Sequence, residues 1–176
     1  MAIEISINHA GRIGRFFLVL IMKKIIGIIF LILLTALIVA QFFRPEKNDS
    51  PREDHHILVA EQVPDHIKTI LTNSCLDCHS NQTNYLWYHQ IAPVSWVINN
   101  HIVAGKEHLN LSEWGQQDVF DKIGTLEEMV EEVEEGKMPL KEYVWLHPEA
   151  KMGVEESAQL KEWSEQFSEE LILKSE

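Results

Sequence analysis

The sequence contains only two cysteines among its 176 residues. That number is too small for a scaffold stapled by disulfides. Basic residues are scarce after Arg44, where 10 basic residues face 26 acidic ones and the formal charge is −16, against −12 for the whole chain. A surface this acidic repels the phosphates of nucleic acids and of anionic lipids, so nucleic-acid binding is excluded. No segment alternates convincingly between apolar and polar residues, which argues against a β-sheet.

The apolar residues, by contrast, concentrate in one run near the N-terminus. Residues 25–43 (IIGIIFLILLTALIVAQFF) carry no charge, and Lys23 and Lys24 precede them. A helix of this length rises about 28 Å, close to the roughly 30 Å hydrocarbon core of a bilayer. We therefore expect a transmembrane anchor over 25–43. Because positive charges stay on the cytoplasmic side, residues 1–24 form a cytoplasmic stub and the rest of the chain lies outside.

Two alternatives to a permanent anchor stay open. A cleaved signal peptide needs small residues at the −3 and −1 positions, and the best candidate, Ile38-Val39-Ala40, has a bulky residue at −3. A buried core helix of a soluble protein is the other. Met22-Lys23-Lys24 before the apolar run is typical of a natural beginning of a targeting sequence. We therefore hypothesise that translation starts at Met22 and that residues 1–21 are an extension.

Apolar residues recur at helical spacing in four segments beyond residue 63. Two of these segments open on a proline, which suits a first helical turn, and a third carries Thr125 and Glu128 at the spacing of a capping box. Residues 44–63 begin polar and lack this periodicity, as expected for a linker. The sequence therefore predicts an all-α domain over residues 64–176. The expected helices cover residues 64–73, 93–105, 125–136 and a segment that begins near 154.

The two cysteines belong to a C-x-x-C-H motif, Cys75-Leu76-Asp77-Cys78-His79. Two thiols one helical turn apart can form thioether bonds to the two vinyl groups of one haem, and the adjacent imidazole then reaches the iron. A thioredoxin-like redox pair would require a βαβ pattern, and zinc would require two histidine ligands in addition. We expect one covalent haem c, attached to Cys75 and Cys78, with His79 as the proximal iron ligand.

The distal ligand is expected in the segment Gly136-Lys137-Met138-Pro139. Its glycine ends a helix and its proline prevents the helix from continuing, so the methionine lies on a restrained loop. Methionine opposite histidine raises the reduction potential and suits electron transfer. We predict Met138 as the distal iron ligand. The alternatives that stay open are His89, His101, His108, His147 and Met152.

Further segments stand out beside the motif: NSCLDCHSNQTNY from residue 73 with Trp87-Tyr88, IAPVSW from 91, GKEHLN from 105, KMPL from 137 and HPEA from 147. Together they resemble the small haem-binding domain family of exported bacterial proteins, which is related to cytochromes c. The likeness covers roughly residues 63–163. It implies covalent haem c, a cytochrome c-like helical fold and a location in the cell envelope, but no established reaction.

Aromatic residues cluster near the motif at Tyr85, Trp87, Tyr88 and Trp96. Aromatic rings bury a large area and suit packing against a porphyrin. We therefore expect Tyr85, Trp87 and Trp96 to line the haem pocket.

These expectations describe a mono-haem cytochrome with a single-pass anchor in the bacterial cytoplasmic membrane and a periplasmic domain. The protein would transfer single electrons as a carrier, a role that requires no substrate chemistry. Its acidic surface would steer a redox protein partner with a basic docking surface. The alternative is a haem-based peroxidase-like enzyme, or a gas or redox sensor, whose sixth ligand is open or displaceable.

Overall fold

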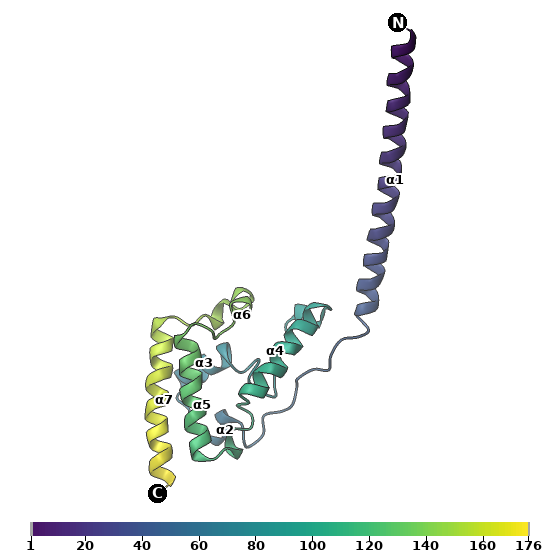
Figure 1. The fold of residues 1–176 in the computed structure, drawn as a ribbon. Helices are drawn as coiled ribbons and strands as arrows, with labels where there is room; N and C mark the ends of the chain where they lie inside the picture. Colours follow the sequence, from purple (N-terminus) through teal and green to yellow (C-terminus); the bar gives the residue numbers. More distant parts are fainter. Residues whose placement is uncertain (1, 176) are drawn as a thin grey trace.

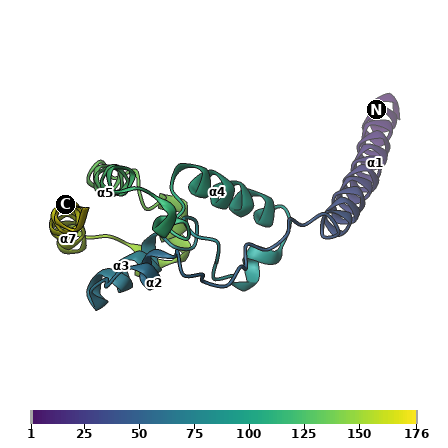
Figure 2. The same cartoon turned by 90° about the horizontal axis from the view of Figure 1, so that it is seen from below.

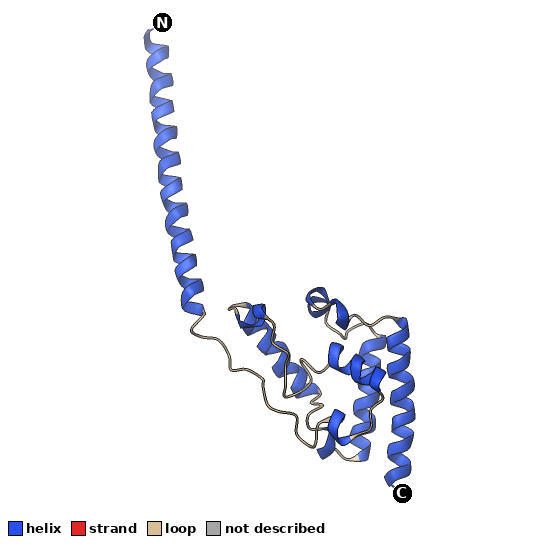
Figure 3. Ribbon diagram, turned by 180° about the vertical axis from the view of Figure 1, so that it is seen from behind, coloured by secondary structure: helices blue, strands red, loops and turns tan. Residues whose placement is uncertain are grey.

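The computed structural model describes residues 2–175, with side chains from residue 18 onward. Across those residues the regular elements are all helices and no strand occurs, as Figure 3 shows. The all-α prediction is confirmed. The helices are α1 (Ala2–Ala40), α2 (Ile57–Ala60), α3 (Asp65–Ser74), α4 (Val94–His108), α5 (Val119–Glu134), α6 (Lys141–Leu146) and α7 (Val154–Ser175), with short 3-10 helices η1 (Trp87–Gln90), η2 (Trp114–Gln116) and η3 (Pro148–Ala150).

Helix α1 stands apart from the other helices (Figure 1). Its segment Leu18–Ala40 has a mean hydropathy of 2.6 and is long and apolar enough to cross a membrane. This apolar segment begins and ends earlier in the sequence than the anchor expected over residues 25–43. Met1 and the side chains of residues 2–17, which belong to the expected cytoplasmic stub, lie outside the described part of the chain.

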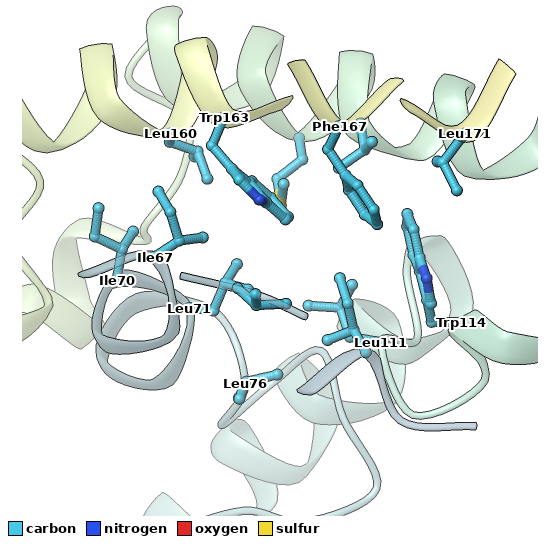
Figure 4. Close-up of a cluster of buried hydrophobic side chains, with 14 residues drawn as sticks. Ile67, Ile70, Leu71, Leu76, Leu111, Trp114, Leu160, Trp163, Phe167 and Leu171 are labelled. Atoms are coloured by element: carbon cyan, nitrogen blue, oxygen red, sulfur yellow. The ribbon is translucent and has the colours of Figure 1, made fainter. Parts of the chain in front are cut away.

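The core of the domain lies between α3, α5 and α7. Helices α5 and α7 run side by side (Figures 1 and 2), and Figure 4 shows the apolar side chains of α7 facing those of α3. The rings of Trp163 and Phe167 stack at 5.3 Å between centroids, and Trp114 stacks on Phe167 at 5.8 Å. Full burial of one large apolar side chain contributes roughly 1.5–3 kcal/mol, so this cluster is the main source of stability. Its other members include Ile67, Leu71, Leu111, Leu126 and Leu160, all of which are fully buried.

Helix α5 begins earlier than the sequence predicts. Its N-cap is Asp118, whose carboxylate accepts a hydrogen bond from the amide of Asp121 at 2.9 Å. Thr125 therefore lies inside the helix and does not cap it. A side-chain oxygen at the N-cap satisfies an amide that the helix leaves free, and Asp is as good a residue for this as Ser or Thr. The capping-box spacing of Thr125 and Glu128 is coincidental.

Residues 44–63 do not form a free spacer. Ile57 is fully buried in the core, and the side-chain amide of Asn48 donates to the carbonyl of Ser80 at 2.8 Å and to the hydroxyl of Thr83 at 2.9 Å. The periodicity is absent from the sequence because this segment contacts the domain mostly as extended backbone, and its one helix has a single turn. The compact domain therefore includes residues well before the expected boundary at 64.

Candidate haem site

The C-x-x-C-H segment begins where α3 ends. Cys75 is the C-cap of α3, and its amide donates to the carbonyl of Leu71. The amides of Cys78 and His79 both donate to the carbonyl of Cys75, at 3.2 and 2.9 Å, and close a tight turn. Leu76, at a variable position of the motif, is only 3% exposed and belongs to the core. The two thiols and the imidazole thus project from a turn that the core holds in place.

Helix α4 crosses this turn at Gly105. A Cβ atom built on Gly105 would lie 2.8 Å from the carbonyl oxygen of Cys78 and 3.3 Å from its Cβ. The first of these distances is shorter than real side chains tolerate, so the approach of α4 requires glycine at this position. Glycine here brings the helix against the backbone of the motif.

The residue after α4 fixes the ring of His79. Nδ1 of His79 lies 3.1 Å from the carbonyl oxygen of Leu109. Because a carbonyl can only accept, Nδ1 carries the proton and Nε2 keeps its lone pair free. Burial lowers the pKa of His79, which keeps the imidazole neutral at neutral pH. An imidazole whose Nδ1–H is bound to a carbonyl is the usual arrangement of a metal-binding histidine.

A cavity of about 460 Å³ opens beside the motif, between α4 and α5. Its size is in the range of pockets that hold small organic ligands and cofactors, about 300–1,000 Å³. The lining includes Cys75, Cys78 and His79, then His101, Ala104, Gly105, His108 and Leu109, then Thr125, Glu128, Met129, Glu132 and Val133, and finally Met138, Pro139, Leu140 and Tyr143.

The thiols in this cavity are not activated. Burial, reinforced by the neighbouring thiol of Cys78, raises the pKa of Cys75 to about 12. Burial, reinforced by the charge of Asp77, raises the pKa of Cys78 to about 11. A redox-active cysteine has a lowered pKa and is a thiolate near neutral pH, which is the opposite of what the burial produces here. Within the described residues no three potential ligands gather to hold a metal ion directly. Two neutral thiols beside an apolar cavity and a free imidazole nitrogen fit a haem better than zinc or a redox dithiol.

Met138 lies on the wall of the same cavity. The backbone after α5 turns at Gly136, which has a φ of 67°. The amides of Lys137 and Met138 then both donate to the carbonyl of Glu132 at 3.0 Å, so the loop is tied back to the helix. The structure therefore brings Met138, which is distant in sequence, to the cavity that holds Cys75, Cys78 and His79.

The open alternatives for the distal ligand divide into two groups. His101 and His108 of α4 line the cavity together with Met138. His89 and His147 do not line it; their rings stack on each other outside it, at 5.9 Å between centroids. Met152 packs against the apolar core. The candidates near the haem cavity are therefore Met138, His101 and His108.

Tyr85, Trp87 and Trp96, which the sequence predicts to line the haem pocket, are not among the residues that line this cavity. The hydroxyl of Tyr85 accepts from the amide of Asn48 at 2.8 Å, Trp87 is 76% exposed, and Nε1 of Trp96 donates to the carbonyl of Phe43 at 2.8 Å. Their sequence proximity to the motif misleads because the chain after His79 pairs with the segment before α2: the amide of Thr83 donates to the carbonyl of Asn48 and the amide of Ser50 donates to the carbonyl of Asn81, both at 2.9 Å.

The aromatic residue at the cavity is Tyr143 of α6, which the sequence analysis did not single out. Its hydroxyl donates to Oδ2 of Asp77 at 2.9 Å, and its ring stacks on His147 at 4.2 Å between centroids. Burial, reinforced by the negative charge of Asp77, raises the pKa of Tyr143, so the phenol remains a donor. Nε2 of His147 in turn lies 2.6 Å from the hydroxyl of Tyr88. The contact with Asp77 joins α6 to the segment between the two cysteines, and the contact of His147 with Tyr88 joins the end of α6 to η1.

Comparisons with known proteins agree with this site. The model of a family described as a haem-binding domain matches residues 35–166, which is most of the chain. No curated protein and no solved structure matches the sequence. The family match extends over the motif turn, both cavity helices and the loop of Met138, and it supports haem as the cofactor. The chain belongs to the haem-binding domain family.

Proposed function

We propose that this protein is a membrane-anchored mono-haem c-type cytochrome that transfers single electrons in the cell envelope. The observation that carries the proposal is that Cys75, Cys78, His79 and Met138 line one cavity, with the ring of His79 oriented by Leu109. Two thiols, an imidazole and a thioether are the groups that would attach one haem and bind its iron.

Attachment uses the two cysteines. Cys75 and Cys78 would each add to one vinyl group of the haem: the sulfur would bond to one carbon and the thiol hydrogen would end on the other, so that each thioether would form without loss of atoms. Cys75 and Cys78 are held by the turn after α3, and both face the cavity. Because two covalent bonds hold the group, no large binding energy from the pocket is required.

The protein then holds the iron ligands in place. When bound, the haem supplies one-electron chemistry, since its iron passes between the ferric and ferrous states. His79 is oriented by its hydrogen bond to Leu109, and Met138 is restrained between Gly136 and Pro139. Ligands that do not move between the two oxidation states keep the reorganisation small, and a methionine ligand raises the reduction potential.

The proposed location is the outer face of the bacterial cytoplasmic membrane, with α1 as a single-pass anchor. Glu128 and Glu132 of α5 line the cavity near Met138, and they belong to the acidic run that begins at Glu127. A redox partner with a basic surface would dock at this rim, close to the haem. Such contacts are weak, fast and sensitive to salt.

The test uses the full chain matured with cytochrome c assembly factors and purified in detergent. The oxidised protein should show the long-wavelength charge-transfer band of iron bound by a methionine sulfur, and it should be reduced reversibly by one electron. Met138→Ala should lose this band, whereas Met152→Ala, whose sulfur packs in the core, should keep it. Retention of the band in Met138→Ala contradicts the ligand assignment. Rapid binding of small molecules or peroxide turnover by the unchanged protein would favour a haem enzyme or sensor instead.

A further inference from the structure

The five tryptophans of the chain fall into two groups. Trp114 and Trp163 are buried in the core, at 0% and 8% exposure. Trp87, Trp96 and Trp145 are 76%, 39% and 82% exposed. A tryptophan ring in water leaves a large apolar area unpaired, so three exposed rings in one small domain require an explanation.

The exposed rings come from the end of the domain nearest to α1. Trp87 lies in η1, Trp96 in the first turn of α4 and Trp145 in α6. Figures 1 and 3 show the start of α4 and helix α6 at the end of the domain that reaches toward the base of α1. The beginning of α5 and the end of α7 lie at the opposite end. A bilayer around the apolar part of α1 would therefore lie against the end that carries these rings.

The segment after α1 is bound to this end by specific hydrogen bonds. The side chain of Gln41 donates to the carbonyl of Ala92 at 3.0 Å and accepts from its amide at 3.1 Å. The indole of Trp96 donates to the carbonyl of Phe43 at 2.8 Å. These hydrogen bonds hold the start of α4 beside the C-terminal end of α1, so the domain is not joined to α1 by a free linker.

Other apolar side chains close in sequence to Trp96, and one in the segment after α1, are exposed as well. Ile91, Val94 and Val97 are 40%, 40% and 54% exposed at the start of α4, and Phe42 is 83% exposed in the adjoining segment. We define the membrane-facing surface as Trp87, Ile91, Val94, Trp96, Val97 and Trp145. Tryptophan is enriched where proteins meet the interfacial layer of a bilayer, because its ring is apolar and its N–H is polar.

We propose that this membrane-facing surface rests in the interfacial layer of the same bilayer that α1 crosses. The inference relies on the membrane anchoring included in the proposed function, but not on the haem chemistry. The occupant is lipid with a zwitterionic headgroup, because the charge of −16 after Arg44 opposes contact with anionic lipid. Burial of the rings, and not attraction between charges, supplies the binding free energy. This contact fixes the orientation of the haem cavity relative to the membrane.

The test uses the full haem-loaded chain in vesicles of phosphatidylcholine. A fraction of the lipid molecules carries a photoactivatable diazirine on the acyl chain, close to the headgroup. After illumination, the labelled peptides are identified by mass spectrometry. We expect label on α1, on the peptides that contain Trp87 to Val97 and on the peptide with Trp145. The peptide with Phe120 is the internal control, because this side chain is 84% exposed but lies at the start of α5, at the far end. It should carry no label.

Label confined to α1 would contradict the docking of the membrane-facing surface but would agree with α1 as a membrane anchor. Label absent from the whole chain would overturn both the docking and the anchor, whereas the haem spectrum of the same sample reports separately on the cofactor. The double variant Trp87→Ser/Trp145→Ser provides a second measurement, since both rings are exposed and no core contact is lost. Labelling of Ile91 to Val97 should fall severalfold in this variant and remain unchanged in Phe120→Ser. Equal labelling in both variants would contradict the proposal.

Discussion

The backbone of Gly105 in α4 touches the carbonyl of Cys78, so that a Cβ atom on the glycine would lie 2.8 Å from that oxygen. This contact places α4 against the C-x-x-C-H turn and brings Leu109 to the ring of His79. One position without a side chain therefore determines both the wall of the cavity and the orientation of the proposed iron ligand.

Gly105→Ala should disrupt this contact. Because the added methyl group meets backbone and not a flexible side chain, α4 must shift, and a cost of about 1–3 kcal/mol in the free energy of unfolding is expected. The hydrogen bond from His79 to Leu109 should lengthen, and less haem should be incorporated. Denaturant unfolding and the ratio of haem to protein absorbance measure these two effects.

Gly124→Ala is the matched control for that substitution. Gly124 also lies inside a helix, but a Cβ built there meets nothing within 4 Å. Alanine forms helix better than glycine by up to about 1 kcal/mol, so this variant should be as stable as the parent or more stable. Equal behaviour of the two variants would show that the contact with Cys78 is unimportant.

Tyr143→Phe should remove the hydrogen bond to Asp77 while it keeps the ring that stacks on His147. The loss should cost about 1–2 kcal/mol of stability, since a partly buried carboxylate oxygen loses its donor. Because Asp77 lies between the two cysteines, the haem absorption spectrum or the reduction potential should also shift. Tyr85→Phe is the control: its hydroxyl bonds Asn48 away from the cavity, so its loss should leave the spectrum and the potential unchanged.

His56 predicts a pH dependence of stability. The residue is fully buried, and burial, with a smaller contribution from the charge of Arg52, lowers its pKa from 6.5 to about 4. Between these two values the unfolded chain binds a proton that the folded chain does not, so stability rises with pH from 4 to 6.5. The free energy of unfolding should therefore fall on acidification, by at most about 3 kcal/mol from this group.

Unfolding by urea at pH 7.5 and pH 5 measures that dependence. His56→Asn should flatten it, because asparagine does not titrate and its side-chain oxygen can still accept from the amide of Leu58, as Nδ1 of His56 does. His66, which is exposed, provides the control, and His66→Asn should retain the full dependence. An unchanged slope in His56→Asn would assign the acid sensitivity to other groups.

The local features of this chain could be predicted from its sequence. The periodicity of Ile67, Ile70 and Leu71 predicts α3, and the five residues of the motif predict a haem site without any knowledge of the fold. Gly136 and Pro139 predict a loop at Met138, and the structure places that loop on the cavity. In each case residues close in sequence determine the local conformation.

Contacts between distant segments could not be predicted in the same way. The pairing of Gly105 with Cys78, and of Tyr143 with Asp77, depends on how α4 and α6 pack, and neither residue type signals its partner. Residues 44–63 have no helical periodicity, yet Asn48 and Ile57 bind the domain. Tyr85 and Trp96 bind the segment between α1 and α2 and do not line the cavity, which proximity in sequence does not indicate.

The central claim is that haem is bound covalently to Cys75 and Cys78, and its most direct test is the pyridine haemochrome spectrum after extraction with acidified acetone. Protein matured with cytochrome c assembly factors should retain its haem through denaturation and extraction, with the spectrum typical of two thioether bonds. Cys75→Ser/Cys78→Ser should release any haem that it binds. Complete extraction of haem from the unchanged protein, or the absence of haem from it, would contradict the account.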